Sequence, residues 1–568
     1  MNDIRRTILW VIFGFSLVLL WDKWQVHNGN KATFFPEPVR QVAGAPAPTG
    51  PASSTAGQTA LPGTGAAAPL INGAAVPAAA PASAVPHETV VVTTDVLKLT
   101  LDSEGGSLVR SEFLKHGDVA DKNKPLVLLD RGPDRVYMAQ TGLIAGATGG
   151  SFPTHATGMT VVPGERTLKD GAAELVVKFE SPEVAGVKLI KTYTLHRDSY
   201  AISVRHEIVN NSAAPVAPEL YLQLVRDGNK LPGESSFYST FTGPAVYTSA
   251  KKCQKVEFKD IQKGKVDIEP ESSDGYIAMV QHYFASAWIL PDGVKRKLLM
   301  ESFNPGLPVP DCCYRVAMRA PLEAIAPGAS KSVDAQLFVG PQEEKVLEKL
   351  TPGLELVKDY GWTKILAEPL YWLLDKLHGF IGNWGWSIIM LVVLLKAAFY
   401  WLNAKAYASM ARTKLVNPKI MEMRERLKDK PQEMQQEMMR IYREEKINPL
   451  GGCLPIFVQI PVFISLYWVL LSSVEMRHAP WMLWIHDLSA ADPYFILPLV
   501  MTGTTVLQTW LNPTPPDPMQ AKMMLIMPLA FSVMFFFFPA GLVLYWITNN
   551  ALSILQQWFI NKRMGAMG

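Results

Sequence analysis

The residue with the clearest chemical potential is Lys396, which lies in the apolar run Leu391-Val-Val-Leu-Leu-Lys-Ala-Ala-Phe-Tyr400. It lies about ten residues, or roughly 15 Å of helix, beyond Trp386. A charge at this depth of a membrane costs at least about 2.5–3.5 kcal/mol, so it normally faces protein or a wet cavity. No Asp or Glu lies inside the other apolar runs to neutralise it. Lys396 is therefore the first candidate for attracting a charged ligand; the alternative is snorkelling towards headgroups near Lys405.

Uncharged polar side chains interrupt three other apolar runs. They are Gln459 in one run, Thr502, Thr505 and Gln508 at helical spacing in the next, and Thr548, Asn549, Ser553 and Gln556 in the last. Such groups often only join helices through hydrogen bonds. Polar groups on three helices around one unpaired cation are also what a hydrated groove beside lipid requires. We expect this groove to open inward, because the polar residues of the last run lie towards its C-terminal end.

The chain lacks the residue patterns of enzymes. It contains no Gly-rich phosphate loop, no Gly-x-Ser-x-Gly and no His-Glu-x-x-His, and its ten histidines show no metal-ligand spacing near the four cysteines. We therefore expect no catalysis, no metal and no other cofactor. A net charge of +3 over 568 residues gives no basic field, so specific nucleic-acid binding is not expected either.

The elements that must position Lys396 are membrane helices. Charged residues make up 18% of the chain, below the roughly 25% of soluble domains. The C-terminal part predicts five spans, each near the length that crosses hydrocarbon; they lie at about residues 384–401, 453–474, 494–511, 523–538 and 542–560. Residues 1–27 predict an uncleaved signal anchor. Residues 405–446 carry eleven Lys and Arg against seven Asp and Glu, so both termini are expected in the cytoplasm.

Between the signal anchor and the other spans, the composition changes three times. Residues 28–86 are rich in Ala, Pro and Gly and predict a flexible linker. Residues 87–345 alternate apolar and polar types, which predicts an antiparallel β-sandwich outside the cytoplasm. Residues 360–382 predict an amphipathic helix in the outer membrane interface or, alternatively, packed on the β domain. The fold class is therefore an α+β membrane protein.

The cytoplasmic segment, residues 405–448, predicts a helical hairpin. Met423 and Leu427 belong to one apolar stripe, Met434 and Met438 belong to another, and Pro431 separates the two. Methionine-rich stripes usually form a core, but their adaptability also suits a surface that accepts varied partners. Both interpretations stay open.

Three cysteines fall in the domain outside the cytoplasm, which is an oxidising compartment. Adjacent Cys312 and Cys313 cannot easily bridge one another without strain. A disulfide from Cys253 to one of them is one prediction, and three buried thiols are the other.

Several ordered motifs resemble those of the YidC/Oxa/Alb family of membrane protein insertases, in its Gram-negative form. They are Asn448-Pro-Leu-Gly-Gly-Cys-Leu-Pro455, Trp484-Ile-His-Asp-Leu-Ser489, Asp517-Pro-Met519 and Phe538-Pro-Ala-Gly-Leu-Val-Leu-Tyr545. The resemblance is strong over residues 384–561. It implies a signal-anchor helix, a periplasmic β-supersandwich and a five-helix insertase core, residues 383–568, with a cytoplasmic hairpin, in the bacterial inner membrane.

The resemblance also implies roles for particular residues. A groove residue that is positively charged in the family, and arginine in many members, corresponds to Lys396. A family tyrosine corresponds to Trp546, beside Tyr545. The expected groove comprises Lys396, Gln459, Thr505, Gln508, Tyr545, Trp546, Asn549 and Ser553. A hydrophobic slide for clients is expected at Ile460, Pro461, Phe463 and Met534, and a capture surface on the hairpin at Met423, Leu427, Met434 and Met438.

This resemblance implies four kinds of partner: nascent membrane proteins, the ribosome, the Sec translocon with its accessory subunits, and membrane lipids. It also implies that the chain works as a monomer. The alternative is a secondary transporter that uses Lys396 as a counter-charge, although no internal repeat supports it. A third possibility, a sugar-processing β domain, finds no outstanding pair of carboxylates.

Overall fold

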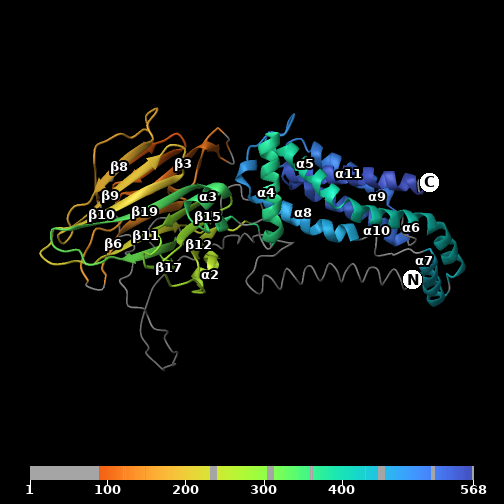
Figure 1. Cartoon of the computed structure of the whole chain (residues 1–568), viewed down its shortest axis with the longest axis horizontal. Helices are drawn as coiled ribbons and strands as arrows, with labels where there is room; N and C mark the ends of the chain where they lie inside the picture. The colour runs from red at the N-terminus through yellow and green to blue at the C-terminus, as the bar shows by residue number, and fades with distance from the viewer. Residues whose placement is uncertain are drawn as a thin grey trace, which may run out of the picture.

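The computed structural model describes residues 88–565, apart from residues 119–120, 122, 147–148, 230–239, 304–312, 359, 361–362, 429, 446–453 and 513–517. The expected signal anchor, residues 1–27, and the linker, residues 28–86, lie outside the described residues. What is described divides into a β-rich part and a helical part (Figure 1).

The β-rich part consists of two antiparallel sheets, as the alternating pattern predicts. The first sheet has the order β1-β2-β3-β6-β11-β18-β17-β14, with β4 paired to β3 and β5 paired to β6. Its strands are β1 (Thr89–Thr93), β2 (Leu97–Asp102), β3 (Ser107–Gly117), β4 (Pro125–Val127), β5 (Asp130–Arg131), β6 (Val136–Ile144), β11 (Glu219–Arg226), β14 (Glu271–Ser272), β17 (Arg296–Ser302) and β18 (Tyr314–Pro321).

The second sheet has the order β13-β12-β15-β16-β19-β10-β9-β8-β7. Its strands are β7 (Thr160–Val161), β8 (Glu174–Glu180), β9 (Val187–His196), β10 (Ala201–Asn210), β12 (Gly243–Thr248), β13 (Lys252–Lys255), β15 (Tyr276–Gln281), β16 (Phe284–Ile289) and β19 (Ser330–Pro341). Inward residues of both sheets, such as Leu222 and Trp288, form one buried core. Two short helices, α2 (Phe258–Gln262) and α3 (Glu344–Leu350), accompany the sheets.

The helical part follows a short 3-10 turn, η1 (Leu354–Val357). Its elements are α4 (Lys364–Ile381), α5 (Trp384–Ala398), α6 (Tyr400–Arg426), α7 (Pro431–Glu444), α8 (Leu454–Ser472), η4 (Val474–Met476), α9 (Ile496–Leu511), α10 (Pro518–Met534), η5 (Phe535–Phe537) and α11 (Ala540–Arg563). Helices α5, α8, α9 and α11 contribute to one shared core, which also includes the buried residues of α4.

Helix α4 packs mainly on α5 and α8 rather than on the sheets. Its buried residues include Leu370 and Leu374, as the amphipathic pattern predicts. On the opposite side, Ile365 and Phe380 are 87% and 97% exposed. A location in the outer membrane interface stays a prediction for this apolar exposed face.

Helices α5 and α6 meet at a bend of 70° near Phe399. The sequence predicts that the first core span runs through residue 401, whereas α5 already ends at Ala398. Within the described residues, no single helix combines the length and apolar composition of a membrane crossing, while the α5–α6 pair does so when taken together.

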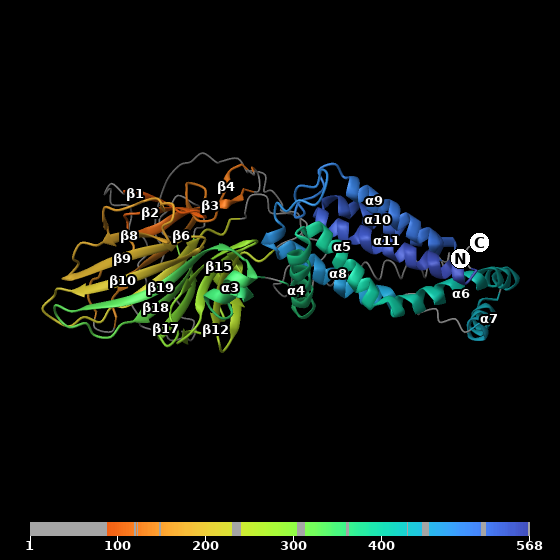
Figure 2. The ribbon, with the colours of Figure 1, turned by 45° about the horizontal axis from the view of Figure 1, so that its top comes forward.

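The predicted hairpin is present as α6 and α7, which share a small core of their own around Val416, Ile420 and Met423. In both orientations the hairpin lies at the end of the helical part that is remote from the sheets (Figures 1 and 2).

The prediction for the cysteines is wrong in both of its forms. Cys313 is disulfide-bonded, whereas Cys253 is a thiol. Cys253 belongs to β13 of the second sheet, and Cys313 directly precedes β18 of the first sheet. The sequence places both cysteines in the same compartment, but it does not reveal that they belong to opposite layers of the sandwich.

Candidate functional site

Lys396 lies in the last turn of α5, just before the bend. Its Nζ donates a hydrogen bond to Oγ of Ser553 on α11 at 2.7 Å, and that hydroxyl in turn donates to the carbonyl of Asn549 at 2.7 Å. Within the part of the chain that the structure describes, Lys396 forms no ion pair. Its charge is therefore held by a neutral hydroxyl.

A small hollow surrounds this ammonium group, and we call it the Lys396 hollow. Four helices contribute to its wall. The lining residues are Val392, Leu395, Lys396, Phe399, Asn403, Gln459, Val462, Tyr545 and Asn549. The wall thus combines amide, hydroxyl and apolar groups, and it brings Gln459, Tyr545 and Asn549 of the expected groove next to Lys396.

One hydrogen bond and one unpaired acceptor mark the part of the wall that α8 and α11 form. Gln459 on α8 donates from Nε2 to the hydroxyl of Tyr545 on α11, which joins these two helices. The amide oxygen of Asn549 is buried and has no hydrogen-bond partner among the described residues. An acceptor without a partner beside an ammonium group leaves polar capacity for water or a ligand.

Trp546 and the expected slide residues are not among the residues that line the hollow, and their settings differ. Trp546 packs edge-to-face on Phe463 at 4.7 Å between ring centroids and also contacts Phe535 at 5.3 Å. Ile460 and Met534 are 47% and 38% exposed, so they present apolar surface outward. Pro461 accepts a hydrogen bond from Ser465 within α8. Two of the four slide residues are thus available at the surface, and Phe463 supports the aromatic packing.

Thr505 and Gln508 do not line the Lys396 hollow. The hydroxyl of Thr505 donates to the carbonyl of Met501 at 2.9 Å and accepts from the amide of Asn550 at 3.1 Å. This contact joins α9 to α11, which is the helix-joining role that polar residues often have in membranes.

The hairpin methionines mostly form the core of the hairpin. Met423 is 4% exposed, and Leu427, Met434 and Met438 pack against the same cluster. Met421 and Met439 are 54% and 46% exposed instead. An adaptable surface therefore exists on the hairpin, but it includes methionines other than those predicted.

Sequence reasoning missed Asn403, which lies on α6 and is only 7% exposed in the wall of the hollow. It is seven positions after Lys396, a spacing that keeps two residues on the same side of a helix. The 70° bend between these two residues interrupts that relation, so the spacing did not reveal the contact, and the predicted span ended before Asn403.

Comparisons with known proteins identify the family of the chain. Residues 89–373 match the family model of the YidC periplasmic domain, and residues 376–566 match that of the 60Kd inner membrane protein. The boundary between these matches falls in the helical segment after the sheets.

The relatives cover nearly the whole chain. The membrane protein insertase YidC of Cupriavidus necator is 56% identical over 99% of this chain and 98% of its own length. The insertase of the same name from Bordetella pertussis is 52% identical with the same coverage. A crystal structure of an active YidC insertase with its first transmembrane domain resolved has a TM-score of 0.38 and 18% identity, covering 83% of this chain and 92% of that chain.

Proposed function

Because this chain belongs to the YidC family of membrane protein insertases, inner-membrane proteins with a periplasmic domain, we propose that it inserts nascent chains through the Lys396 hollow. The observation that carries this proposal is the pairing of the Lys396 ammonium with the neutral hydroxyl of Ser553. A cation without a carboxylate partner attracts an acidic segment of a client. A cation already paired with a carboxylate of the protein would not.

The hollow shortens the polar path across the membrane. The hydrophilic segment of the client enters from the cytoplasmic side, where Gln459 and Asn549 offer hydrogen bonds. Its acidic residues approach Lys396 and then continue outward. The membrane potential contributes about 2.3 kcal/mol per charge per 100 mV, and this favours moving acidic residues to the outside.

The apolar segment of the client follows the outer surfaces of α8 and α10. Ile460 and Met534 present exposed apolar side chains there. The transfer of that segment into lipid is favourable through burial of apolar area alone, at roughly 25 cal/mol per Å². This route needs no nucleotide hydrolysis.

The same proposal includes the surroundings of the reaction. The α6–α7 hairpin and both chain ends lie in the cytoplasm, where the ribosome delivers clients, and the β-sandwich lies in the periplasm. The chain works alone or with the Sec translocon and its accessory subunits, in contact with membrane lipids. The alternative of a secondary transporter has no support from the relatives.

The first prediction concerns the charge of Lys396. Lys396→Ala should slow insertion of clients with acidic tails by several-fold, while Lys396→Arg keeps activity because the charge remains. Insertion into membrane vesicles, measured by protease protection of the translocated tail, provides the readout. Lys405→Ala is the matched control, because Lys405 lies over the Trp401 ring rather than in the hollow. Insertion of acidic tails at the normal rate by Lys396→Glu would contradict the electrostatic part of the mechanism.

A further inference from the structure

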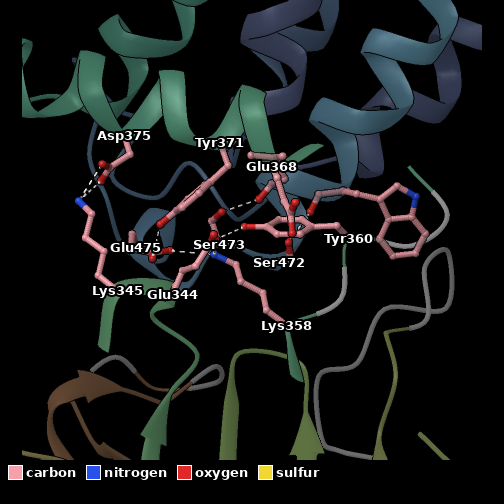
Figure 3. A network of polar contacts seen from close by, with 12 residues as sticks. Glu344, Lys345, Lys358, Tyr360, Glu368, Tyr371, Asp375, Ser472, Ser473 and Glu475 are labelled. Carbon is pink, nitrogen blue, oxygen red and sulfur yellow. Dashed lines mark hydrogen bonds and ion pairs between the residues drawn. The ribbon is translucent and has the colours of Figure 1, made fainter. Parts of the chain in front are cut away.

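The end of α8 next to the β-sandwich is built into both parts of the molecule. The three consecutive residues of η4 have three different surroundings: the core of the β-sandwich, a cluster of polar side chains and the core of the helices. Val474 is 3% exposed within the core of the β-sandwich, and Met476 is 1% exposed within the core of the helices. Glu475 lies between them in a cluster of polar side chains (Figure 3). This turn therefore fixes α8 to the sandwich.

Lys358 is the cation at the centre of that cluster (Figure 3). Its side chain is 1% exposed, and its Nζ lies 4.0 Å from Glu344 and 3.9 Å from Glu475. The ammonium group also lies over the rings of Tyr371 and Tyr360, at 4.0 Å and 5.3 Å from the centroids. Such positions over aromatic faces are attractive for a cation.

Two tyrosines hold the carboxylates in place. Tyr360 donates to Glu344 at 2.8 Å, and Tyr371 on α4 donates to Glu475 at 2.7 Å. The cluster therefore joins α3 of the sandwich, the connecting segment, α4 and the end of α8 (Figure 3).

The charges in this cluster depend on one another. Burial lowers the pKa of Lys358, while Glu475 and Glu344 oppose that effect. Burial likewise raises the pKa of Glu344, which Tyr360 and Lys358 oppose. Removing one partner from a buried group of charges leaves an uncompensated charge, which is far more harmful than removing the whole group. The positive charge of Lys358 compensates the buried negative charges of Glu344 and Glu475.

Further contacts flank the same end of α8. The ring nitrogen Nε2 of His282, in the turn between β15 and β16, lies 2.8 Å from the carbonyl of Leu471. Since a carbonyl only accepts, Nε2 carries the proton. Arg477 lies over the rings of Tyr283 and Phe284, at 6.0 Å and 5.7 Å. The sandwich thus contacts this end of α8 from several sides.

We propose that Lys358 is a positioning residue for insertion: by compensating Glu344 and Glu475, it fixes the direction of α8 relative to the β-sandwich. Helix α8 carries Gln459 in the wall of the Lys396 hollow and Ile460 on its exposed side. A change in the direction of α8 at Ser472 moves Gln459 and Ile460 as well, because the helix continues on both sides of Pro461 although that proline removes one backbone hydrogen bond. This inference rests on the proposed function, since it concerns the path of the client along α8.

The test compares the client's contact with two helices. A photoreactive amino acid replaces Ile460 on α8 or Met534 on α10, and its crosslinking to a ribosome-stalled nascent chain with one apolar segment is measured in membrane vesicles. Lys358→Met should lower the ratio of the yield at 460 to the yield at 534 by about threefold or more, as expected for coupled sites. Lys345→Met is the matched control, because the side chain of Lys345 is 67% exposed where it pairs with Asp375 in the same cluster; it should leave the ratio unchanged.

A second variant separates charge compensation from loss of folding. Lys358→Met combined with Glu344→Gln and Glu475→Gln removes both carboxylates that lie within ion-pair distance of Lys358, and the amide oxygens still accept from the two tyrosines. The ratio should return towards that of the unmodified chain. An unchanged ratio in Lys358→Met, or no recovery in the triple variant, would overturn the inference. Absence of crosslinks at both positions in the unmodified chain would instead contradict the proposed function.

Discussion

At the scale of single residues, the β-sandwich contains an unusual lysine. Lys191 on β9 is 0% exposed, and its Nζ donates to the carbonyls of Gly105 at 2.6 Å and Thr141 at 2.7 Å. Burial lowers the pKa of Lys191 from 10.5 to about 7. The two carbonyl groups compensate only part of the hydration that the ammonium group loses on burial, and the pKa therefore stays below its usual value.

The pKa of Lys191 gives the second prediction, a pH dependence of stability. Above pH 7 the folded state releases this proton while the unfolded state keeps it up to about pH 10.5, so stability rises with pH in this window. The slope from one proton is at most about 1.4 kcal/mol per pH unit. Burial lowers the pKa values of the neighbouring His155 and His206 to about 4 and about 3, so both are neutral throughout the window.

Hydrogen exchange of β9 and β10 amides in the full chain between pH 7.5 and pH 9, corrected for intrinsic rates, measures this slope. Lys191→Met should remove most of it, because Met has no proton to bind. Lys188→Met is the control, since Lys188 lies on the same strand and pairs with Glu180 near the surface. Equal slopes in the unmodified chain and in Lys191→Met would refute the assignment.

A single side chain that departs from its surroundings is the clearest signal at the residue level. Lys396 stands out in an apolar run, and the structure gives it a polar hollow. Lys191 departs in the same way, because it occupies an inward position between Leu189 and Tyr193 on β9. The alternating pattern could have identified it. Thr505 could not be separated from groove residues, since a threonine in a span looks the same whether it joins helices or lines a pocket.

At the scale of elements, the third prediction concerns how α5 meets the loop before α9. Gly385 allows this loop to approach, because a Cβ at that position would lie 2.2 Å from the ring of Trp481. Asn383 also holds the loop by donating to the carbonyls of Pro480 and Trp481. Gly385→Ala should therefore lower the melting temperature of the full chain in detergent by several degrees, because overpacking typically costs about 1–3 kcal/mol.

The control for this prediction is Gly379→Ala in α4, where an added Cβ meets open space. There alanine should leave the melting temperature unchanged or raise it slightly, since alanine favours a helix interior by roughly 0.5–1 kcal/mol. A Gly385→Ala chain as stable as the Gly379→Ala chain would mean that Trp481 moves aside at no cost.

Helices and strands with a strong hydrophobic period were predictable from the sequence. The bends and turns that connect them were not. The alternating strands and the apolar helices follow the sequence pattern closely, as α11 (Ala540–Arg563) does. The 70° bend between α5 and α6 has no such signal, because neither Pro nor Gly occurs near Phe399. The bend places Asn403 in the wall of the hollow, and that is why this residue was missed.

At the scale of the whole molecule, three bodies follow one another along the long axis. The β-sandwich occupies one end, the core helices follow, and the α6–α7 hairpin occupies the other end (Figures 1 and 2). Composition and charge predicted these three parts. The joint around Lys358 was not predictable, because it unites residues from α3, the connecting segment, α4 and η4 that share no sequence pattern.

The last prediction follows from the separate core of the hairpin. Val416, Ile420 and Met423 pack against residues of α7 and not against the core of the other helices. Replacing residues 415–443 by a short Gly/Ser linker should therefore leave the melting temperature of the remaining chain nearly unchanged. Early crosslinking of a stalled nascent chain to the vesicle-bound protein should nevertheless fall several-fold, because the linker removes the exposed apolar side chains of Met421 and Met439. Met421→Glu with Met439→Glu is the matched variant, which keeps the hairpin folded while making that surface polar. Normal capture by both variants would show that clients reach the Lys396 hollow without the hairpin.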